Sequence, residues 1–175
     1  MIDFIKLCLF GTSAALLGGA GVAAQAPPPT PREFAQATAQ SAQFEILEAE
    51  TAQAQSRDPR IQAFAQEMIR DHGAMRQAVT QAAVQSGLGA PPMGISPDQS
   101  RLLYGLQSLR GMDFDKMYVT QQVLTHHQAL VVEEGYGARG SNANLRNAAT
   151  TAVPLIRHHL DMAQQLKGAL IGAER

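Results

Sequence analysis

Three segments of this sequence begin with the same helix-starting pattern, in which a residue that can cap a helix is followed directly by proline. The pairs are Thr30-Pro31, Asp58-Pro59 and Ser96-Pro97. A capping side chain satisfies a free backbone N–H of the first turn, and proline suits the first helical position because it needs no N–H partner there. No run of the sequence shows the two-residue alternation of a β-strand. These features predict an all-α fold.

Apolar side chains recur at helical spacing in four long segments and one short one. Capping residues, prolines and glycines at the ends of these segments set the expected boundaries. The expected helices cover residues 31–55, 59–86, 97–109 and 114–136, followed by a last one that starts near residue 142. Four long helices with short connections predict an antiparallel four-helix bundle of the ferritin-like type over residues 31–170, with an additional short helix before the third long helix.

Individual residues give more local expectations for the last two long helices. Asp113 is expected to cap the third long helix after Gly111 interrupts the chain, and Ser141 or Asn142 is expected to cap the last one. Pro154 lies inside the last helix and is expected to kink it, because proline removes one backbone donor.

The first 24 residues differ from the rest and have the features of a cleavable signal peptide. Lys6 provides a weakly positive start, and apolar and small residues follow it up to Ala24, after which cleavage is expected. An uncleaved anchor is the alternative, although glycines break the apolar run. Residues 25–30 then form a Pro-rich linker. The protein is therefore expected to be exported to the periplasm or cell envelope, with association with the outer membrane as an open alternative.

Composition excludes several classes of function. The one cysteine, Cys8, lies inside the signal segment, so the mature protein would have no disulfide, thiolate ligand or cysteine nucleophile. The formal net charge of −1 argues against nucleic-acid binding, and no Lys/Arg cluster supports a membrane-surface helix. After signal cleavage no membrane span is expected, and the pattern gives no indication of an oligomeric state. No phosphate loop, nucleotide fingerprint or Ser-His-Asp signature is present, which favours a non-enzymatic role.

Histidine placement is the most informative feature for function. Three of the five histidines, His72, His126 and His159, lie on the apolar faces of three expected helices. The other two, His127 and His158, are their neighbours in the sequence and are expected to face solvent.

The first long helix has no histidine, but Glu45 and Glu48 lie three residues apart near its apolar face. A bundle can bring one inward side chain from each helix to a common level. Glu45 and the three inward histidines are therefore a candidate set of metal ligands. Imidazole and carboxylate groups bind zinc, copper and iron, so a divalent ion of one of these metals is the cofactor that this alternative would require.

Two other interpretations of the same residues stay open. A buried histidine that is hydrogen-bonded to a carboxylate on a neighbouring helix would hold the helices in register without any ion. An uncharacterised enzyme, a hydrolase or an oxidase, is the third interpretation. Met68 and Met75 flank His72 and would suit copper, although such a stripe also fills a core. The absence of a Glu-x-x-His motif disfavours a di-iron centre.

Three stretches of the sequence also match a known pattern: EFAQATAQSAQFEILEAETAQAQSRDPRIQAFAQEMIRDHGAM, FDKMYVTQQVLTHHQAL and VPLIRHHLDMAQQL. In these stretches, over residues 32–166, the chain resembles the bacterial family called domain of unknown function 4142. The resemblance implies an exported ferritin-like helical bundle with no established activity. The family pattern carries onto seven positions: Glu45, Asp71, His72, Asp115, Tyr118, His126 and His159.

The resemblance adds Asp71, Asp115 and Tyr118 as residues expected to support the metal ligands. A capped helix with an amphipathic tyrosine anchor is the simpler interpretation of Asp115 and Tyr118. Related exported bundles are suspected of metal handling, but a shared fold does not give a function. The leading interpretation is a non-enzymatic exported bundle of unassigned role in envelope or stress physiology, with a metal-binding protein as the alternative.

Overall fold

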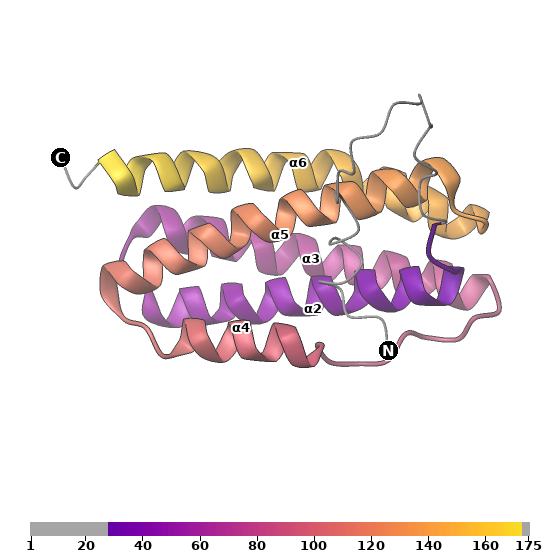
Figure 1. The fold of residues 1–175 in the computed structure, drawn as a ribbon, viewed down its shortest axis with the longest axis horizontal. Coiled ribbons are helices and arrows are strands. Elements are labelled where there is room, and N and C mark those ends of the chain that lie inside the picture. The colour runs from indigo at the N-terminus through magenta and orange to yellow at the C-terminus, as the bar shows by residue number, and fades with distance from the viewer. Residues whose placement is uncertain (1–27, 173–175) are drawn as a thin grey trace, which may run out of the picture.

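The computed structural model describes residues 28–172, and every regular element in that part of the chain is an α-helix. The helices are α2 (Pro31–Gln55), α3 (Pro59–Gln85), α4 (Pro97–Gln107), α5 (Gly111–Arg139) and α6 (Ala143–Gly172) (Figure 1). The all-α prediction is confirmed. The predicted signal segment, residues 1–24, lies outside the described residues.

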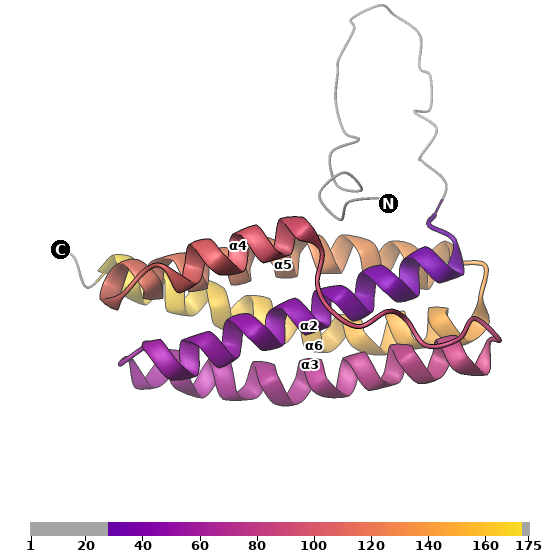
Figure 2. The same ribbon diagram turned by 90° about the horizontal axis from the view of Figure 1, so that it is seen from below.

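Two helical hairpins, α2 with α3 and α5 with α6, make up most of the described fold. They pack on each other through α3 against α6 and α2 against α5, so the four long helices surround a common interior (Figure 1, Figure 2). Consecutive helices run in opposite directions along the long axis of the molecule. The short helix α4 lies on the outside, next to α2 and α5.

The three cap-and-proline starts form as the sequence predicts. Thr30 and Glu33 make a reciprocal capping box at the start of α2, in which the Thr30 N–H donates to Glu33 Oε2 at 2.9 Å. Asp58 accepts a hydrogen bond from the Arg60 N–H at the start of α3. Ser96 forms a second capping box at the start of α4. These local hydrogen bonds satisfy first-turn N–H groups, which fixes where the helices begin.

The start of α5 differs from the prediction. The helix begins at Gly111, its N-cap is Arg110 without a side-chain cap, and Asp113 lies in the first turn. Gly111 has a φ of 57°, a left-handed conformation that glycine adopts without strain, so it turns the chain directly into the helix. The predicted cap at Asp113 is therefore wrong, although a carboxylate in the first turn still suits the helix dipole. The helix also continues to Arg139, beyond the predicted end.

At the start of α6, the structure selects one of the two predicted caps. The Leu145 N–H donates to Asn142 Oδ1 at 3.0 Å, which makes Asn142 the capping side chain. The helix then continues through Pro154 to Gly172, and the kink at Pro154 stays a prediction.

Apolar side chains form two separate clusters, one toward each end of the bundle. One cluster includes Phe64, Met68 and Phe114. The other includes Phe34 and Tyr136, whose rings stack with centroids 3.8 Å apart. Between the two clusters, along each of the long helices, lie buried polar residues. We refer to six of them as the polar layer: Glu45, Glu48, His72, Gln122, His126 and His159.

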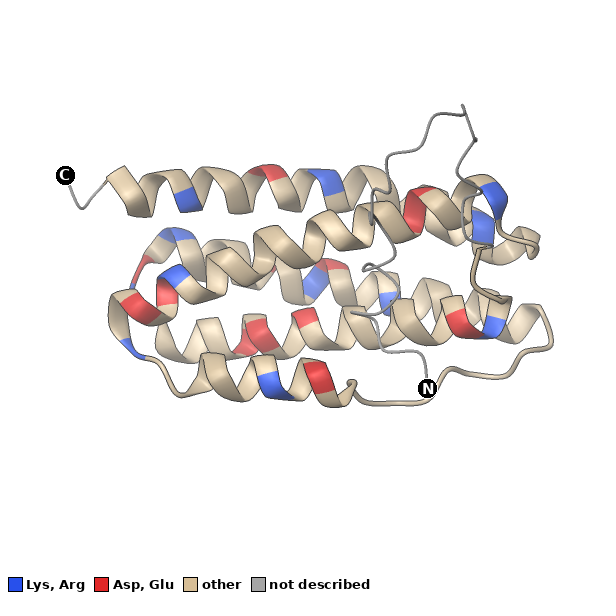
Figure 3. Ribbon diagram, in the orientation of Figure 1, with Lys and Arg blue, Asp and Glu red and all other residues tan. Residues whose placement is uncertain are grey.

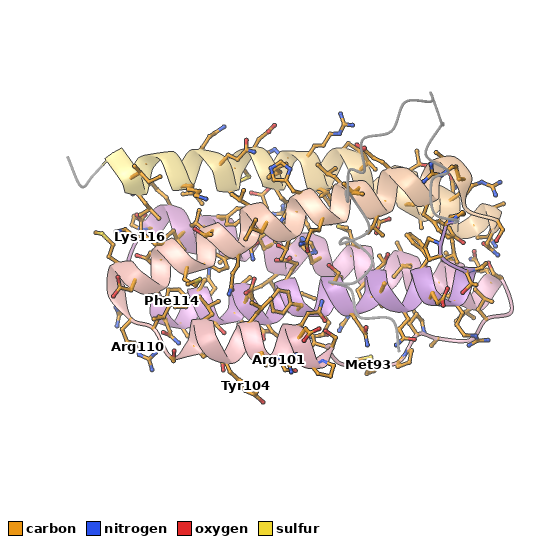
Figure 4. All side chains as sticks on the ribbon, in the orientation of Figure 1. Met93, Arg101, Tyr104, Arg110, Phe114 and Lys116 are labelled. Atoms are coloured by element: carbon orange, nitrogen blue, oxygen red, sulfur yellow. The ribbon has the colours of Figure 1, made fainter. Side chains whose placement is uncertain are left out.

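Charged residues of both signs are spread over the helices (Figure 3). The outer side of α4 carries Tyr104, which points away from the bundle (Figure 4). Between residues 28 and 172, no helix has the combination of length and hydropathy that crossing a membrane would need.

Gly140 gives a direct test of the packing at one end. An added Cβ there would overlap the Tyr136 ring, whereas Gly168 has open space around its Cα. Gly140→Ala should therefore destabilise the fold by about 1–3 kcal/mol through overpacking. The matched change Gly168→Ala, at an exposed position inside helix α6, should stabilise it by about 0.5–1 kcal/mol. Chemical denaturation measures both values, and equal effects would contradict this packing.

Candidate metal centre

Three imidazole rings converge in the middle of the bundle, each from a different long helix. His72 comes from α3, His126 from α5 and His159 from α6. Their ring centroids are 5.3–5.5 Å apart, and one ring nitrogen of each lies within 4.8 Å of the others. The three residues are only 4%, 1% and 0% exposed, respectively. The packing of the helices therefore gathers all three predicted inward histidines into one buried group, called here the histidine centre.

Hydrogen bonds fix the tautomers of two of these rings. His126 Nδ1 lies 2.8 Å from the backbone carbonyl oxygen of Gln122, and His159 Nε2 lies 3.1 Å from Asp71 Oδ2. Both oxygens can only accept, so the facing nitrogen of each ring carries the hydrogen. This leaves His126 Nε2 and His159 Nδ1 with lone pairs, and neither atom has a hydrogen-bond partner among residues 28–172.

His72 has no hydrogen-bond partner on either ring nitrogen within the described part of the chain. Its neighbours are the two other imidazoles, one stacked and one edge-on. A buried polar atom without a partner costs about 1–3 kcal/mol, so an arrangement of three such rings is not explained by packing alone.

The electrostatics of the centre keep the rings neutral. Burial and the neighbouring histidines lower the pKa of His72 well below its usual value, and burial lowers the pKa of His126 to about 3. Burial also lowers the pKa of His159, against the opposing effect of Asp71. Burial alone would raise the pKa of Asp71, but its bonds to Arg70 and His159 outweigh that effect and lower it. At neutral pH the centre thus offers three uncharged imidazoles beside an ionised carboxylate.

This geometry is suited to a metal ion. Metal–nitrogen bonds of about 2 Å place ligand nitrogens roughly 3–4 Å apart around one ion. The ring nitrogens lie within 4.8 Å of one another, so a small movement of the rings would bring them to that spacing. Metal-binding histidines characteristically donate their second N–H to a carboxylate or a backbone carbonyl, as His159 and His126 do here. A set of three imidazoles leaves a coordination position open for water or another ligand.

Glu45 is buried, but it does not belong to the histidine centre. Its Oε2 and that of Glu48 both accept hydrogen bonds from Gln122 Nε2, at 2.7 and 2.8 Å. Burial raises the pKa of Glu45 to about 7, despite hydrogen bonds to Thr125 and Gln122 that oppose the change. Burial and the neighbouring Glu45 raise the pKa of Glu48 as well. The two glutamates form a carboxyl pair that holds a proton more strongly than exposed carboxyls do.

The structure places the other two supporting candidates apart from the three rings. Tyr118 is fully buried, and burial, Glu48 and Glu45 raise the pKa of its hydroxyl, which places it near the carboxyl pair. Asp115 is partly buried and belongs to neither of the two groups among the described residues that could hold a metal ion. Asp71 is the supporting candidate that contacts a ring of the centre.

Sequence reasoning missed two residues that matter here. Gln122 connects the carboxyl pair to His126, and it lies one turn before His126 on the same face of α5. Glu67 lies one turn before Asp71 on α3 and contacts His158 Nε2 at 3.3 Å. An i, i+4 search around each inward histidine and its acidic neighbour would have found both. His127 and His158 are exposed, as predicted.

The fold and the site define an all-α bundle with a buried histidine cluster. The sequence profile of the family called domain of unknown function 4142 (DUF4142) matches residues 18–166, so the chain belongs to that family. No curated protein matches the chain significantly.

Solved structures with the same fold include two kinds of protein. A DUF305 fragment from Deinococcus radiodurans has a TM-score of 0.69 and 16% identity, and covers 82% of this chain and 99% of its own. CopM in its Cu(II)-bound form has a TM-score of 0.69 and 16% identity, and covers 81% and 98%. CopM in its Cu(I)-bound form has a TM-score of 0.65 and 17% identity, and covers 78% and 94%. At these identities the likeness concerns the fold.

The lowered pKa of His126 predicts an acid-sensitive core in the metal-free protein. The unfolded chain binds a proton near pH 6.5, whereas the folded chain binds it only near pH 3, so stability is lost as the pH falls through this window. Lowering the pH from 6.5 to 4 should therefore reduce the free energy of unfolding by on the order of 3 kcal/mol through this histidine. Denaturation at several pH values should show that His126→Gln reduces the loss, while the same change at exposed His127 leaves it unchanged. Equal pH dependence of both variants would contradict the neutral buried ring.

Proposed function

We propose that this protein is an exported metal-binding bundle and that its histidine centre binds one copper ion. The observation that carries the proposal is the group of three buried imidazoles whose inward nitrogens have no partner among residues 28–172. Two of the rings are already oriented by Asp71 and the Gln122 carbonyl, so binding would need little rearrangement. One ion would bind, on each of the three rings, one nitrogen that is unpartnered within the described part of the chain.

A purely structural network explains the centre less well than a metal site does. A register-setting histidine would be hydrogen-bonded to a carboxylate on a neighbouring helix, and His159 meets that description through Asp71. His72 does not, because within the described residues neither of its nitrogens is hydrogen-bonded. The structural role and the metal role therefore coexist, with Asp71 and Gln122 holding rings that the ion would bind.

Copper is favoured over zinc and iron by the ligand set. All three candidate ligands are neutral imidazoles, which suit copper and zinc, and copper(II) binds such sites most tightly among the first-row divalent ions. Iron sites in bundles use several carboxylates, whereas the carboxyl pair of this chain is bonded to Gln122. CopM, whose fold is similar, has been solved with copper in both oxidation states, which supports the same choice.

We place this function in the periplasm or the cell envelope, where the predicted signal segment would send the protein, and we assign the bundle to the antiparallel ferritin-like type. The metal would be the cargo of a binding protein and not the cofactor of an enzyme. His72, His126 and His159 are the proposed ligands. Asp71 positions His159, and Glu45 acts on His126 only through Gln122.

Titration of the purified protein with copper tests the proposal. Isothermal calorimetry should show one ion bound per chain, and at free copper 100 times the Kd the ion should stabilise the fold by about 2.7 kcal/mol. Substitution by glutamine at His72, His126 or His159 should abolish binding, while His127→Gln should bind like the wild type. Glu45→Gln should still bind one ion, because Glu45 is not a proposed ligand.

The controls separate loss of binding from loss of structure. Circular dichroism of each variant checks that the helices are retained before its titration is interpreted. A wild-type protein that binds no ion, or a folded variant lacking two of the three histidines that binds copper normally, would rule out the centre. Preferential binding of zinc at equal concentrations would keep the centre and reject copper.

A further inference from the structure

We infer that Glu67, Asp71 and His158 form an outer metal site at the surface, which captures the incoming ion and passes it to the histidine centre. This inference rests on the proposed function, because it describes how the ion reaches that centre. We call these three residues the outer site.

The outer site is formed where α3 packs against α6. Glu67 and Asp71 lie one turn apart on α3 and face His158 and His159, which are consecutive residues of α6. His158 Nε2 lies 3.3 Å from Glu67 Oε1, and His159 Nε2 lies 3.1 Å from Asp71 Oδ2. Ligand atoms of Glu67, Asp71 and His159 lie within 4.8 Å of one another, so the two acidic side chains converge on the outer edge of the centre.

His159 belongs to both groups and connects them. Its Nε2 faces Asp71 on the outer side, and its Nδ1 has no partner among the described residues and belongs to the buried side. Side-chain exposure falls from 55% at His158 to 26% at Glu67, 13% at Asp71 and 0% at His159. Candidate ligands thus continue from solvent to the buried rings. His158 contacts Glu67 at 3.3 Å, and ligand atoms of Glu67, Asp71 and His159 lie within 4.8 Å of one another.

Arg70 occupies the position that a cation would take. Its guanidinium contacts Asp71 Oδ1 at 2.7 Å and Glu67 Oε1 at 3.4 Å, while its own side chain is 66% exposed. Exposed ion pairs of this kind contribute little to stability, so Arg70 can move into solvent at small cost. The two carboxylates then hold a net negative charge beside the centre, which raises the local concentration of cations.

The outer site and the histidine centre also differ in ligand chemistry, and the difference matches the order in which an incoming ion would meet them. Carboxylate oxygens and an exposed imidazole bind an ion that still keeps some of its water. The histidine centre is buried and offers imidazoles only, so it binds the ion after that water has been lost. Asp71, which contacts His159, is the residue at which the ion changes from oxygen to nitrogen ligands.

A cavity between α3 and α6 is the competing place at which an ion could approach the centre. This cavity, of about 390 Å³, is lined by Met75, Ala152, Leu155 and Glu133, among others. Met75 lies one turn from His72, and Leu155 lies one turn from His159. Filling this cavity with Ala152→Leu therefore serves as a test of the competing route.

The experiment measures the rate of Cu(II) uptake by the metal-free protein in stopped-flow mixing. Glu67→Gln should slow uptake by about tenfold or more, because it removes one of the two charges that attract the ion. Release of copper to a chelator should slow as well, and one ion per chain should still be bound at the end. Arg70→Gln should speed uptake, since it removes the competing cation.

Asp98→Asn is the matched control, because it removes a carboxylate that pairs with one arginine, Arg101, on the distant helix α4. It should leave both rates unchanged. Wild-type rates in Glu67→Gln, or slowing by Ala152→Leu in its place, would overturn the outer site while the histidine centre stands. A wild-type protein that takes up no copper at all overturns the proposed function and the outer site with it.

Discussion

The structure depends on the burial of a polar layer in the middle of a bundle that is apolar toward both ends. Each buried polar atom without a partner costs about 1–3 kcal/mol, and the two apolar clusters must offset that cost. Hydrogen bonds within the layer satisfy part of it, chiefly through Gln122 and Asp71. The unsatisfied nitrogens that remain are concentrated on the three facing imidazoles. Among residues 28–172, unpartnered buried oxygens also occur, among them those of Tyr118, Glu133 and Tyr136, so what distinguishes the centre is that three rings with unpartnered nitrogens face one another.

Gln122 makes the layer continuous. Its side-chain amide donates to Glu45 and Glu48, which joins α5 to α2. Its backbone carbonyl accepts from His126 at the same level of α5. Across the three rings, the bond between His159 and Asp71 joins α6 to α3 in the same way. Each of these two pairs of helices is therefore held in axial register at the level of the rings. Under the proposed function, the alternatives of a structural network and a metal site, which the sequence leaves open, describe two roles of the same contacts.

The sequence predicts the helices well because their signals are local. Caps such as Thr30 and Asp58 act on the next turn and need no information about the rest of the fold. Asp113 shows the limit, since Gly111 in a left-handed conformation starts α5 earlier than the cap pattern suggests. Helical periodicity also identifies which histidines face inward. It gives the face of a helix but not which acidic side chain meets which ring, so the bond from Asp71 to His159 and the pairing of Glu45 with Gln122 required the packed structure.

Charge balance explains why ionised carboxylates lie near the surface while the candidate ligands in the interior are neutral imidazoles. A cation placed among three neutral rings in a buried interior loses its hydration and needs negative charge nearby. Asp71 supplies that charge through its hydrogen bond to His159, and Arg70 balances it on the solvent side. Asp71, in direct contact with Arg70, stays ionised near the surface because its pKa is lowered, whereas the raised pKa values of Glu45 and Glu48, buried around Gln122, favour the protonated form. The carboxylates that can attract an ion are thus outside, and the ligands that can hold it without water are inside.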